Sequence, residues 1–183
     1  MLILASNSPR RKQLLEMVGL KFKVVPSNYD EAALKLKNIY KLPYELAKKK
    51  AEAIAKLYPN DTILAADTDV FVDGKMLGKP NGPKGVKQIL KALSNKTHFV
   101  ITGVTIIHKN KKISFESKTK VSFYPISDKE INDYIKTKEP FDKSGAYAIQ
   151  GFGARFIKKI DGDYYTIMGL PIAQVIKHLE KLK

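Results

Sequence analysis

The sequence of 183 residues contains no cysteine. Without cysteine the chain can form neither disulfides nor thiolate metal sites. It also lacks an apolar run long enough to span a membrane, and no apolar signal segment stands near its first residue. These absences lead us to expect a cytoplasmic protein that has no signal peptide and no membrane partner.

Arginine is scarce, although the chain is strongly basic with a net charge of +15. Only Arg10, Arg11 and Arg155 are arginines, so 33 basic residues minus three leaves 30 lysines. Proteins that read nucleic acids favour arginine, because its planar group forms paired hydrogen bonds. Lysines scattered along a whole chain are more typical of a solvated surface. We therefore expect no specific nucleic-acid partner.

Histidine offers little to a catalytic or metal site. His98, His108 and His178 stand far apart in the sequence, without metal-ligand spacing and without the pattern of a catalytic triad. The chain also lacks the GxGxxG fingerprint of dinucleotide-binding proteins and the Walker loop. We interpret the three histidines as structural or surface residues.

Strand and helix patterns alternate along the chain. Strands are predicted at 2–5, 21–25, 62–66, 69–72, 75–78, 97–107 and 113–124, helices at 9–18, 43–58, 84–93, 128–137 and 171–182, a glycine-rich strand region at 144–157, and a second hairpin at 161–162. Ser127 and Glu130 form a capping box at the start of one helix. The alternation predicts a single α/β domain over residues 1–183, with a mixed sheet and helices on its faces.

The segment ILASNSPRRKQLLEMVG places a strand, a polar loop and the start of a helix in succession. Ser8 is a suitable N-cap, which puts Arg10 and Arg11 in the first helical turn. Cations there oppose the helix dipole, at about 0.3–1 kcal/mol each. Their position becomes favourable if a phosphate binds at the helix N-terminus, with the Ser6 hydroxyl nearby. The alternative is two surface arginines that tolerate a small penalty.

Lys50 falls inside the apolar stripe of the predicted helix 43–58. At 100° per residue it stands about 40° from Leu46, with Ile54 at about 80°. Burial of an ammonium group is costly unless the group is paired. Lys50 therefore either extends its head to solvent or reaches a substrate phosphate or a catalytic carboxylate. Its central position favours the second interpretation.

The segment TILAADTDVFVDGKMLGKP places Asp67 and Thr68 at the expected end of a strand. Acids at the carboxyl end of a strand are well placed for chemistry in α/β sheets. The Asp-Gly pair that follows predicts a two-residue hairpin, which would pair Thr68 with Lys79. A carboxylate, a hydroxyl and an ammonium would then converge. An ordinary hairpin with an acidic strand end is the alternative.

Three glycines surround a short apolar strand in the predicted region 144–157. Gly145, Gly151 and Gly153 permit close backbone approach or positive φ angles. They flank Gln150, whose amide both donates and accepts hydrogen bonds. A buried glutamine here could recognise the edge of a nucleobase. A glycine-rich β-bulge is the alternative.

Three groups of motifs follow one another along the chain. They are ASNSPRR followed after two residues by LL, AADT with LGKP downstream, and DKSGAYAIQG followed by IDGDYY and MGLP. Together they resemble the Maf family of nucleoside triphosphate pyrophosphatases. The resemblance extends over essentially the whole chain. The sequence is most similar to the branch that acts on dTTP and UTP, and another branch acts on 7-methyl-GTP.

The resemblance implies a Maf/ITPase-like α/β fold, with an elongated twisted sheet and two lobes around a central cleft. It implies hydrolysis of a nucleoside triphosphate between the α- and β-phosphates, by water that attacks the α-phosphorus. The products are a nucleoside monophosphate and pyrophosphate. A divalent metal cation, Mg²⁺ or Mn²⁺, is the implied cofactor, and a homodimer is plausible.

The resemblance also implies roles for individual residues. Asp67 matches the proton acceptor, and Lys50 and Lys79 match catalytic positions that contact phosphate. Substrate-binding and specificity positions are matched by Ser6, Arg10, Arg11, Thr68 and Gln150. Glu31 matches an acidic position implicated in metal binding together with Asp67, with Asp30 as the alternative.

The charges of these residues are consistent with such a reaction. Four predicted cationic side chains would offset the roughly four negative charges of a triphosphate: Arg10, Arg11, Lys50 and Lys79. Phosphoryl-type transfer depends on positioning and charge neutralisation more than on a covalent nucleophile. Three other functions stay open: a 7-methyl-GTP pyrophosphatase of the same family, a basic nucleic-acid-binding protein, and a regulatory protein whose active site is vestigial.

Overall fold

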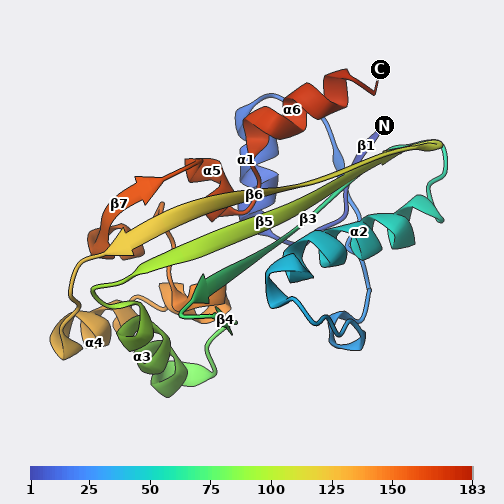
Figure 1. Cartoon of the computed structure of the whole chain (residues 1–183). Coiled ribbons are helices and arrows are strands. Elements are labelled where there is room, and N and C mark those ends of the chain that lie inside the picture. The colour runs from blue at the N-terminus through green and yellow to red at the C-terminus, as the bar shows by residue number, and fades with distance from the viewer. Residues whose placement is uncertain (183) are drawn as a thin grey trace. The chain divides into compact units, whose positions relative to one another are not determined.

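The computed structural model describes residues 1–182 (Figure 1). The strands are β1 (Leu2–Leu4), β2 (Lys23–Val24), β3 (Thr62–Val72), β4 (Lys75–Leu77), β5 (Thr97–His108), β6 (Lys111–Phe123) and β7 (Ile157–Asp161). The helices are α1 (Pro9–Met17), α2 (Leu42–Ala55), α3 (Gly82–Leu93), α4 (Asp128–Lys136), α5 (Tyr164–Met168) and α6 (Ile172–Glu180). Short 3₁₀ segments are η1 (Glu31–Ala33), η2 (Ile39–Lys41), η3 (Glu139–Asp142), η4 (Ser144–Ala146) and η5 (Phe152–Phe156). Within residues 1–182, no helix combines the length and the apolarity that a bilayer crossing requires.

The strands form one mixed sheet. Their order is β2-β1-β3-β5-β6-β7, and β4 pairs with β3 outside this path. β1 pairs in parallel with both β2 and β3, whereas β3–β4 and β6–β7 are antiparallel. The predicted α/β class with a mixed sheet and flanking helices is therefore confirmed.

The chain divides into two compact units. The first unit contains residues Met1–Asp67, Thr102–Ser117 and the segment from Gly169 onward. The second unit contains Thr68–Ile101 and Lys118–Met168. Each unit has its own apolar core. The predicted two lobes around a cleft stay a prediction.

The core of the first unit follows from alternation along β1 and β3. The register pairs Ile3 with Ile63, and side chains two residues apart share a face of a strand. The residues of this face form one buried cluster with the apolar side of α2, made of Ile3, Ala5, Ala51, Ile54, Ile63, Ala65 and Ile107. Leu4 and Leu64 point to the opposite face and are also completely buried. Figure 1 shows α6 on that other side of the strands from α2.

Gly103 allows α2 to approach the sheet closely. A side chain at this position of β5 would overlap the backbone of Pro43 and Tyr44 at the start of α2. Backbone atoms of a packed helix cannot move aside as a flexible side chain can. The position of α2 on the sheet therefore depends on the absence of a side chain at residue 103.

The second unit packs α3 and α4 together against its strands (Figure 1). Its largest completely buried side chains come from β3, β6, α4 and η5: Phe71, Phe123, Tyr134 and Phe156. His98 of β5 lies in the same core with no exposed surface. Its Nε2 lies 2.8 Å from the Tyr147 hydroxyl, and its ring packs edge-on against Phe123. The interpretation of His98 as a structural residue is confirmed.

The structure corrects the sequence prediction in the region of β3. The strands predicted at 62–66 and 69–72 form one continuous strand, so Asp67 lies within β3 and not at its end. The hairpin register is confirmed for Val70 with Leu77, but β4 ends there, and the predicted pairing of Thr68 with Lys79 is wrong. The chain leaves β3 because the Gly78 carbonyl accepts a hydrogen bond from the amide of Gly145 instead.

The predicted strand region at 144–157 is also wrong. The chain forms the 3₁₀ segments η4 and η5 there, because Gly145 and Ala146 adopt positive φ angles of 74° and 56°. Nor does a hairpin turn at Asp161 and Gly162. The Asp163 carboxylate accepts a hydrogen bond from the Thr166 amide at 2.6 Å, which starts α5 directly after β7. The capping box of Ser127 and Glu130 is confirmed.

Replacement of Gly103 by alanine should destabilise the protein by about 3 kcal/mol, because the new methyl group has no space beside the α2 backbone. Urea unfolding of the purified variants measures this difference. Gly78→Ala is the matched control, since nothing lies within 4 Å of its added methyl group. Equal stability of the two variants would contradict the close packing of α2.

Burial should make His98 a source of acid sensitivity. Burial lowers the pKa of His98 from 6.5 to about 3, so the unfolded chain binds this proton at a higher pH than the folded chain. The free energy of unfolding should therefore fall as the pH drops below about 6.5, by at most about 1.4 kcal/mol per pH unit from this group. His98→Gln should flatten this dependence in urea unfolding between pH 6.5 and pH 4. His178→Gln, at a much more exposed histidine, should leave it nearly unchanged.

Candidate functional site: an ion-paired lysine and an arginine-bearing helix start

Lys50 lies between two carboxylates in the first unit. Its Nζ lies 2.6 Å from Oδ1 of Asp67 and 2.7 Å from Oε1 of Glu31. The side chains of Lys50 and Asp67 are only 11% and 12% exposed, whereas Glu31 is 57% exposed. The ammonium therefore has a buried carboxylate on one side and a solvent-facing carboxylate on the other.

Periodicity of the two elements explains why Lys50 and Asp67 meet. Lys50 is four residues from Leu46 and from Ile54, both buried, so it belongs to the face of α2 that packs on the sheet. Asp67 continues the alternation of Ile63 and Ala65 along β3, and this is the strand face that α2 covers. The packing of α2 on β3 thus brings Lys50 and Asp67 together, and burial of either charge without the other would be costly.

The structure distinguishes the two neighbouring acids before α2. The Asp30 carboxylate accepts a hydrogen bond from the Ala32 amide at 3.1 Å and caps η1. Glu31 is the first residue of η1 and directs its carboxylate to Lys50. Of the two acids left open by the sequence, Glu31 is the one that contacts Lys50.

Arg11 joins the start of α1 to two other segments of the first unit. Its Nε donates to the Gly169 carbonyl at 2.8 Å, and Nη1 donates to Oγ of Ser6 at 3.0 Å. Only 8% of Arg11 is exposed. The same Ser6 oxygen accepts the Ser8 amide at 3.2 Å. Ser6 and Arg11 are therefore held together at the point where the loop enters the helix.

The helix start has the features expected of an anion site. Ser8 is the N-cap of α1, Pro9 occupies the first turn, and no side chain caps the helix. The first turn contains no acid and carries half-buried Arg10 next to Arg11. Backbone N–H groups at a helix N-terminus and cationic side chains together favour a negatively charged group.

Strand register places this loop near Asp67. Leu4, the last residue of β1, pairs in parallel with Leu64, and the Ala5 amide donates to the Leu64 carbonyl at 2.8 Å. β3 continues for three more residues to Asp67. The loop with Ser6 therefore leaves the sheet beside the stretch of β3 that carries this carboxylate.

The other predicted site residues belong to the second unit. Thr68 follows Asp67 in β3, and its side chain is half-buried. Lys79 is exposed in the segment between β4 and α3. Gln150 is exposed in the turn before η5, so the expectation of a buried glutamine is wrong. Gln150 lies in a turn, and the residues before it do not form the predicted strand.

The donor set fits a divalent cation that binds together with phosphate. Asp67 and Glu31 supply two carboxylates, and Mg²⁺ is commonly held by one or two carboxylates with substrate phosphates completing its shell. Within residues 1–182, no group of three or more histidine or acidic side chains is arranged to hold a metal. The residues therefore fit a cation shared with a ligand better than a permanently enclosed one.

Sequence patterns missed two features of the molecule. The first is the Gly169 carbonyl as a partner of Arg11, although Gly169 lies in the MGLP motif. The second is Glu139, whose carboxylate binds the backbone on the C-terminal side of Gln150. In the sequence, Gly151 could have indicated this contact, because a side chain at residue 151 would overlap the Glu139 carboxylate.

Solved structures of other proteins share this fold. The Ham1 protein of Staphylococcus aureus aligns with a TM-score of 0.56 over 100% of this chain and 99% of its own, at 14% identity. A HAM1 protein of Coxiella burnetii aligns with a TM-score of 0.54 over 98% of each chain, also at 14% identity. At these identities the likeness concerns the fold alone.

Sequence comparison then identifies the family. The profile of the Maf-like protein family matches residues 1–182. A protein of Acholeplasma laidlawii named dTTP/UTP pyrophosphatase is 50% identical over 100% of this chain and 95% of its own length. A protein of Halalkalibacterium halodurans with the same name is 44% identical over 98% of this chain and 94% of its own. The chain belongs to the Maf-like family.

Replacement of Arg11 by alanine should lower the free energy of unfolding by about 2 kcal/mol, because a buried carbonyl and a serine hydroxyl lose a charged donor. Urea unfolding at pH 7 measures the loss. Lys12→Ala is the control on the same helix, since its ion pair with Glu16 is more than half exposed and 3.7 Å long. An Arg11→Ala variant as stable as Lys12→Ala would contradict an anchoring role.

Proposed function

We propose that this protein is a nucleoside triphosphate pyrophosphatase that hydrolyses dTTP and UTP to the monophosphate and pyrophosphate. The observation that carries the proposal is the buried Lys50, held between Asp67 and Glu31 beside the loop of Ser6 and Arg11. Relatives named dTTP/UTP pyrophosphatase that match nearly the whole chain support the same activity.

Asp67 is the proposed proton acceptor. As a carboxylate it can take a proton from the water that attacks the α-phosphorus, with the β-γ pyrophosphate as the leaving group. Lys50 donates to Oδ1 of Asp67 and so fixes the direction of the carboxylate. The second oxygen of Asp67 then has a defined orientation toward a water molecule or a cation.

Asp67 and Glu31 are also the residues proposed to hold a divalent cation, Mg²⁺ or Mn²⁺. When bound, such a cation neutralises phosphate charge and lowers the pKa of a coordinated water. Glu31 is largely exposed and is paired only with Lys50 in the described structure, so its carboxylate can turn toward an arriving ligand. Lys50 would then direct its charge to the phosphates.

The start of α1 is the proposed phosphate-binding segment. The Ser6–Arg11 pair fixes the loop, while the first-turn amides and Arg10 carry positive charge on the same helix end. Preorganised charge of this kind is the main contribution that a protein makes to phosphoryl transfer. The loop would thus bind the triphosphate with little rearrangement.

Residues of the second unit are proposed to recognise the rest of the substrate. Lys79 is an exposed cation suited to a phosphate, and the Thr68 hydroxyl and Gln150 amide can form hydrogen bonds to a sugar or base. The amide of Gln150 can accept from N3–H and donate to O4, the pair of groups that thymine and uracil share. Selectivity for dTTP and UTP over CTP then requires the amide to keep this orientation, because an amide turned by 180° would match cytosine.

Nucleoside triphosphates and the absence of cysteine are consistent with a cytoplasmic location, which is part of the proposal. The homodimer implied by the family resemblance stays a prediction. The 7-methyl-GTP pyrophosphatase activity of another branch is the alternative that the substrate panel below decides.

Pyrophosphate release should be observed from dTTP and UTP with Mg²⁺ or Mn²⁺, and Asp67→Asn should lower kcat by about 10²–10⁴-fold through loss of the proton acceptor. The assay compares dTTP, UTP, CTP, dCTP, GTP, ITP and 7-methyl-GTP at equal concentration. Asp61→Asn is the matched control, because Asp61 pairs with the N-terminal amine at the start of β3. It should retain wild-type activity.

Three results would contradict parts of this proposal separately. Activity on 7-methyl-GTP alone would keep the reaction and overturn the dTTP/UTP preference. A folded wild-type protein inactive on every nucleotide would overturn the reaction itself. An Asp67→Asn variant with full activity would remove Asp67 from its proposed role.

A further inference from the structure

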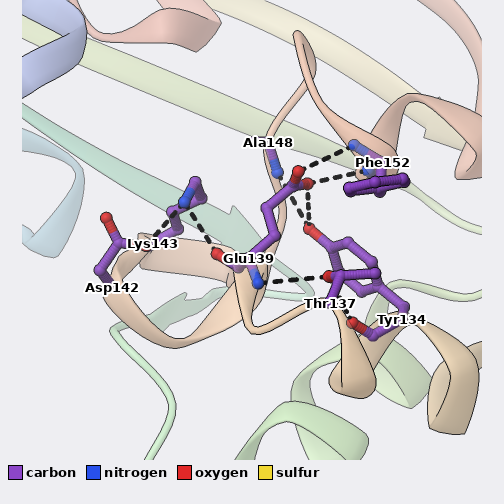
Figure 2. Close-up of polar contacts among 8 residues, drawn as sticks. Tyr134, Thr137, Glu139, Asp142, Lys143, Ala148 and Phe152 are labelled. Atoms are coloured by element: carbon purple, nitrogen blue, oxygen red, sulfur yellow. Dashed lines mark hydrogen bonds and ion pairs between the residues drawn. The ribbon is translucent and has the colours of Figure 1, made fainter.

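A buried tyrosine and a glutamate form hydrogen bonds to the backbone on both sides of Gln150 (Figure 2). We call these two residues and their hydrogen bonds the Tyr134–Glu139 latch. Tyr134 of α4 is completely buried and donates from its hydroxyl to Oε1 of Glu139 at 2.7 Å. The same carboxylate accepts the Phe152 amide on Oε2 at 2.8 Å and the Gly153 amide on Oε1 at 2.9 Å. Three donors thus converge on one carboxylate.

The latch holds the chain on both sides of Gln150. On the N-terminal side the Ala148 amide donates to the Tyr134 hydroxyl at 3.3 Å. On the C-terminal side Phe152 and Gly153 donate to Glu139. Between them Gly151 lies so close to Glu139 that any side chain would overlap its carboxylate. Gln150 is exposed, yet the backbone on each side of it is fixed to the core of the second unit.

The latch is itself held in place. The Thr137 hydroxyl donates to the Tyr134 carbonyl at 2.7 Å and accepts the Glu139 amide at 3.2 Å. The Nζ of Lys143 donates to the Glu139 carbonyl at 2.8 Å and to the Asp142 carboxylate at 2.6 Å. Figure 2 shows these contacts on either side of Glu139.

A carboxylate matches the three donors, because both of its oxygens accept hydrogen bonds. Burial and the adjacent Glu139 raise the pKa of Tyr134, so its hydroxyl stays protonated and donates. Two backbone amides and a phenol then need acceptor oxygens on both sides of the group. A glutamine in place of Glu139 offers a single oxygen and directs an N–H at a backbone N–H.

We propose that Glu139 is a positioning residue for base discrimination, which acts by fixing the backbone that presents Gln150. The inference rests on the proposed function, in which Gln150 recognises the shared edge of thymine and uracil. Cytosine reverses the donor and acceptor at that edge, and a glutamine amide turned by 180° would match it. Discrimination therefore requires the amide to keep both one orientation and a place fixed to within a fraction of an ångström. An exposed side chain on a free turn would not provide this precision.

The experiment compares steady-state pyrophosphate release from UTP and CTP in wild type, Glu139→Gln, Gln150→Ala and the double variant. Glu139→Gln should lower the ratio of kcat/KM for UTP over CTP by about tenfold, mainly through KM for UTP. Gln150→Ala should lower it by a similar factor. The double variant should show no further loss, because both changes remove one and the same contact.

The matched control is Asp133→Asn, the same change of an acid to its amide on α4. Asp133 pairs with Lys136 at a carboxylate that is 44% exposed, outside the contacts that hold Tyr134 and Glu139. All assays run well below the unfolding temperature of each variant. Amide hydrogen exchange of the peptide that covers residues 148–153 should speed up in Glu139→Gln and stay at the wild-type rate in Asp133→Asn.

The outcomes separate this inference from the proposed function. An active, UTP-selective wild type whose selectivity and exchange rate survive Glu139→Gln would overturn the inference alone. Additive losses in the double variant would also overturn it, since Glu139 would then act independently of Gln150. A wild type without pyrophosphatase activity would overturn the proposed function, and this inference with it.

Discussion

An ammonium group cannot remain between an apolar helix face and a sheet without an anion beside it, and the first unit is arranged around this requirement. Lys50 occupies the middle of the α2 face that covers β3, and Asp67 is the buried partner that the strand provides. The pair stays buried because α2 lies close to the sheet, which Gly103 permits. The charged pair proposed to take part in the reaction is therefore also a consequence of how α2 packs on the sheet.

The two units use carboxylates in different ways. In the first unit Asp67 and Glu31 both pair with the ammonium group of Lys50, and the proposed metal cation and phosphate would take over part of these contacts. In the second unit Glu139 accepts three hydrogen bonds from a tyrosine and the backbone, so both of its oxygens are engaged within the protein. Exchangeable partners suit a reaction site, whereas fixed partners suit a support for one.

Family membership and geometry contribute different parts of the functional argument. The relatives indicate which reaction to expect and which nucleotides to test. The geometry indicates why particular side chains are suited to that reaction: Lys50 directs Asp67, and Arg11 fixes Ser6 at a helix start with positive charge. The large lysine excess adds a positive field that favours an anionic substrate but does not identify one.

Local patterns in the sequence determined the α/β class, most helices, the β3–β4 hairpin and the unusual positions of Lys50 and Arg11. These features depend on residues a few positions apart, and helical or strand periodicity records them directly. Sequence patterns predicted three features wrongly: the end of β4, the turns at 144–156 and the exposure of Gln150. β4 ends where the Gly78 carbonyl accepts a hydrogen bond from the distant Gly145 amide, and Gly145 and Ala146 adopt positive φ angles that strand periodicity does not record. The choice of Glu31 over Asp30 as the partner of Lys50, and of Glu139 as the anchor of the Gln150 turn, belonged to the tertiary structure alone. Both depend on contacts between residues that only the folded chain brings within hydrogen-bonding distance.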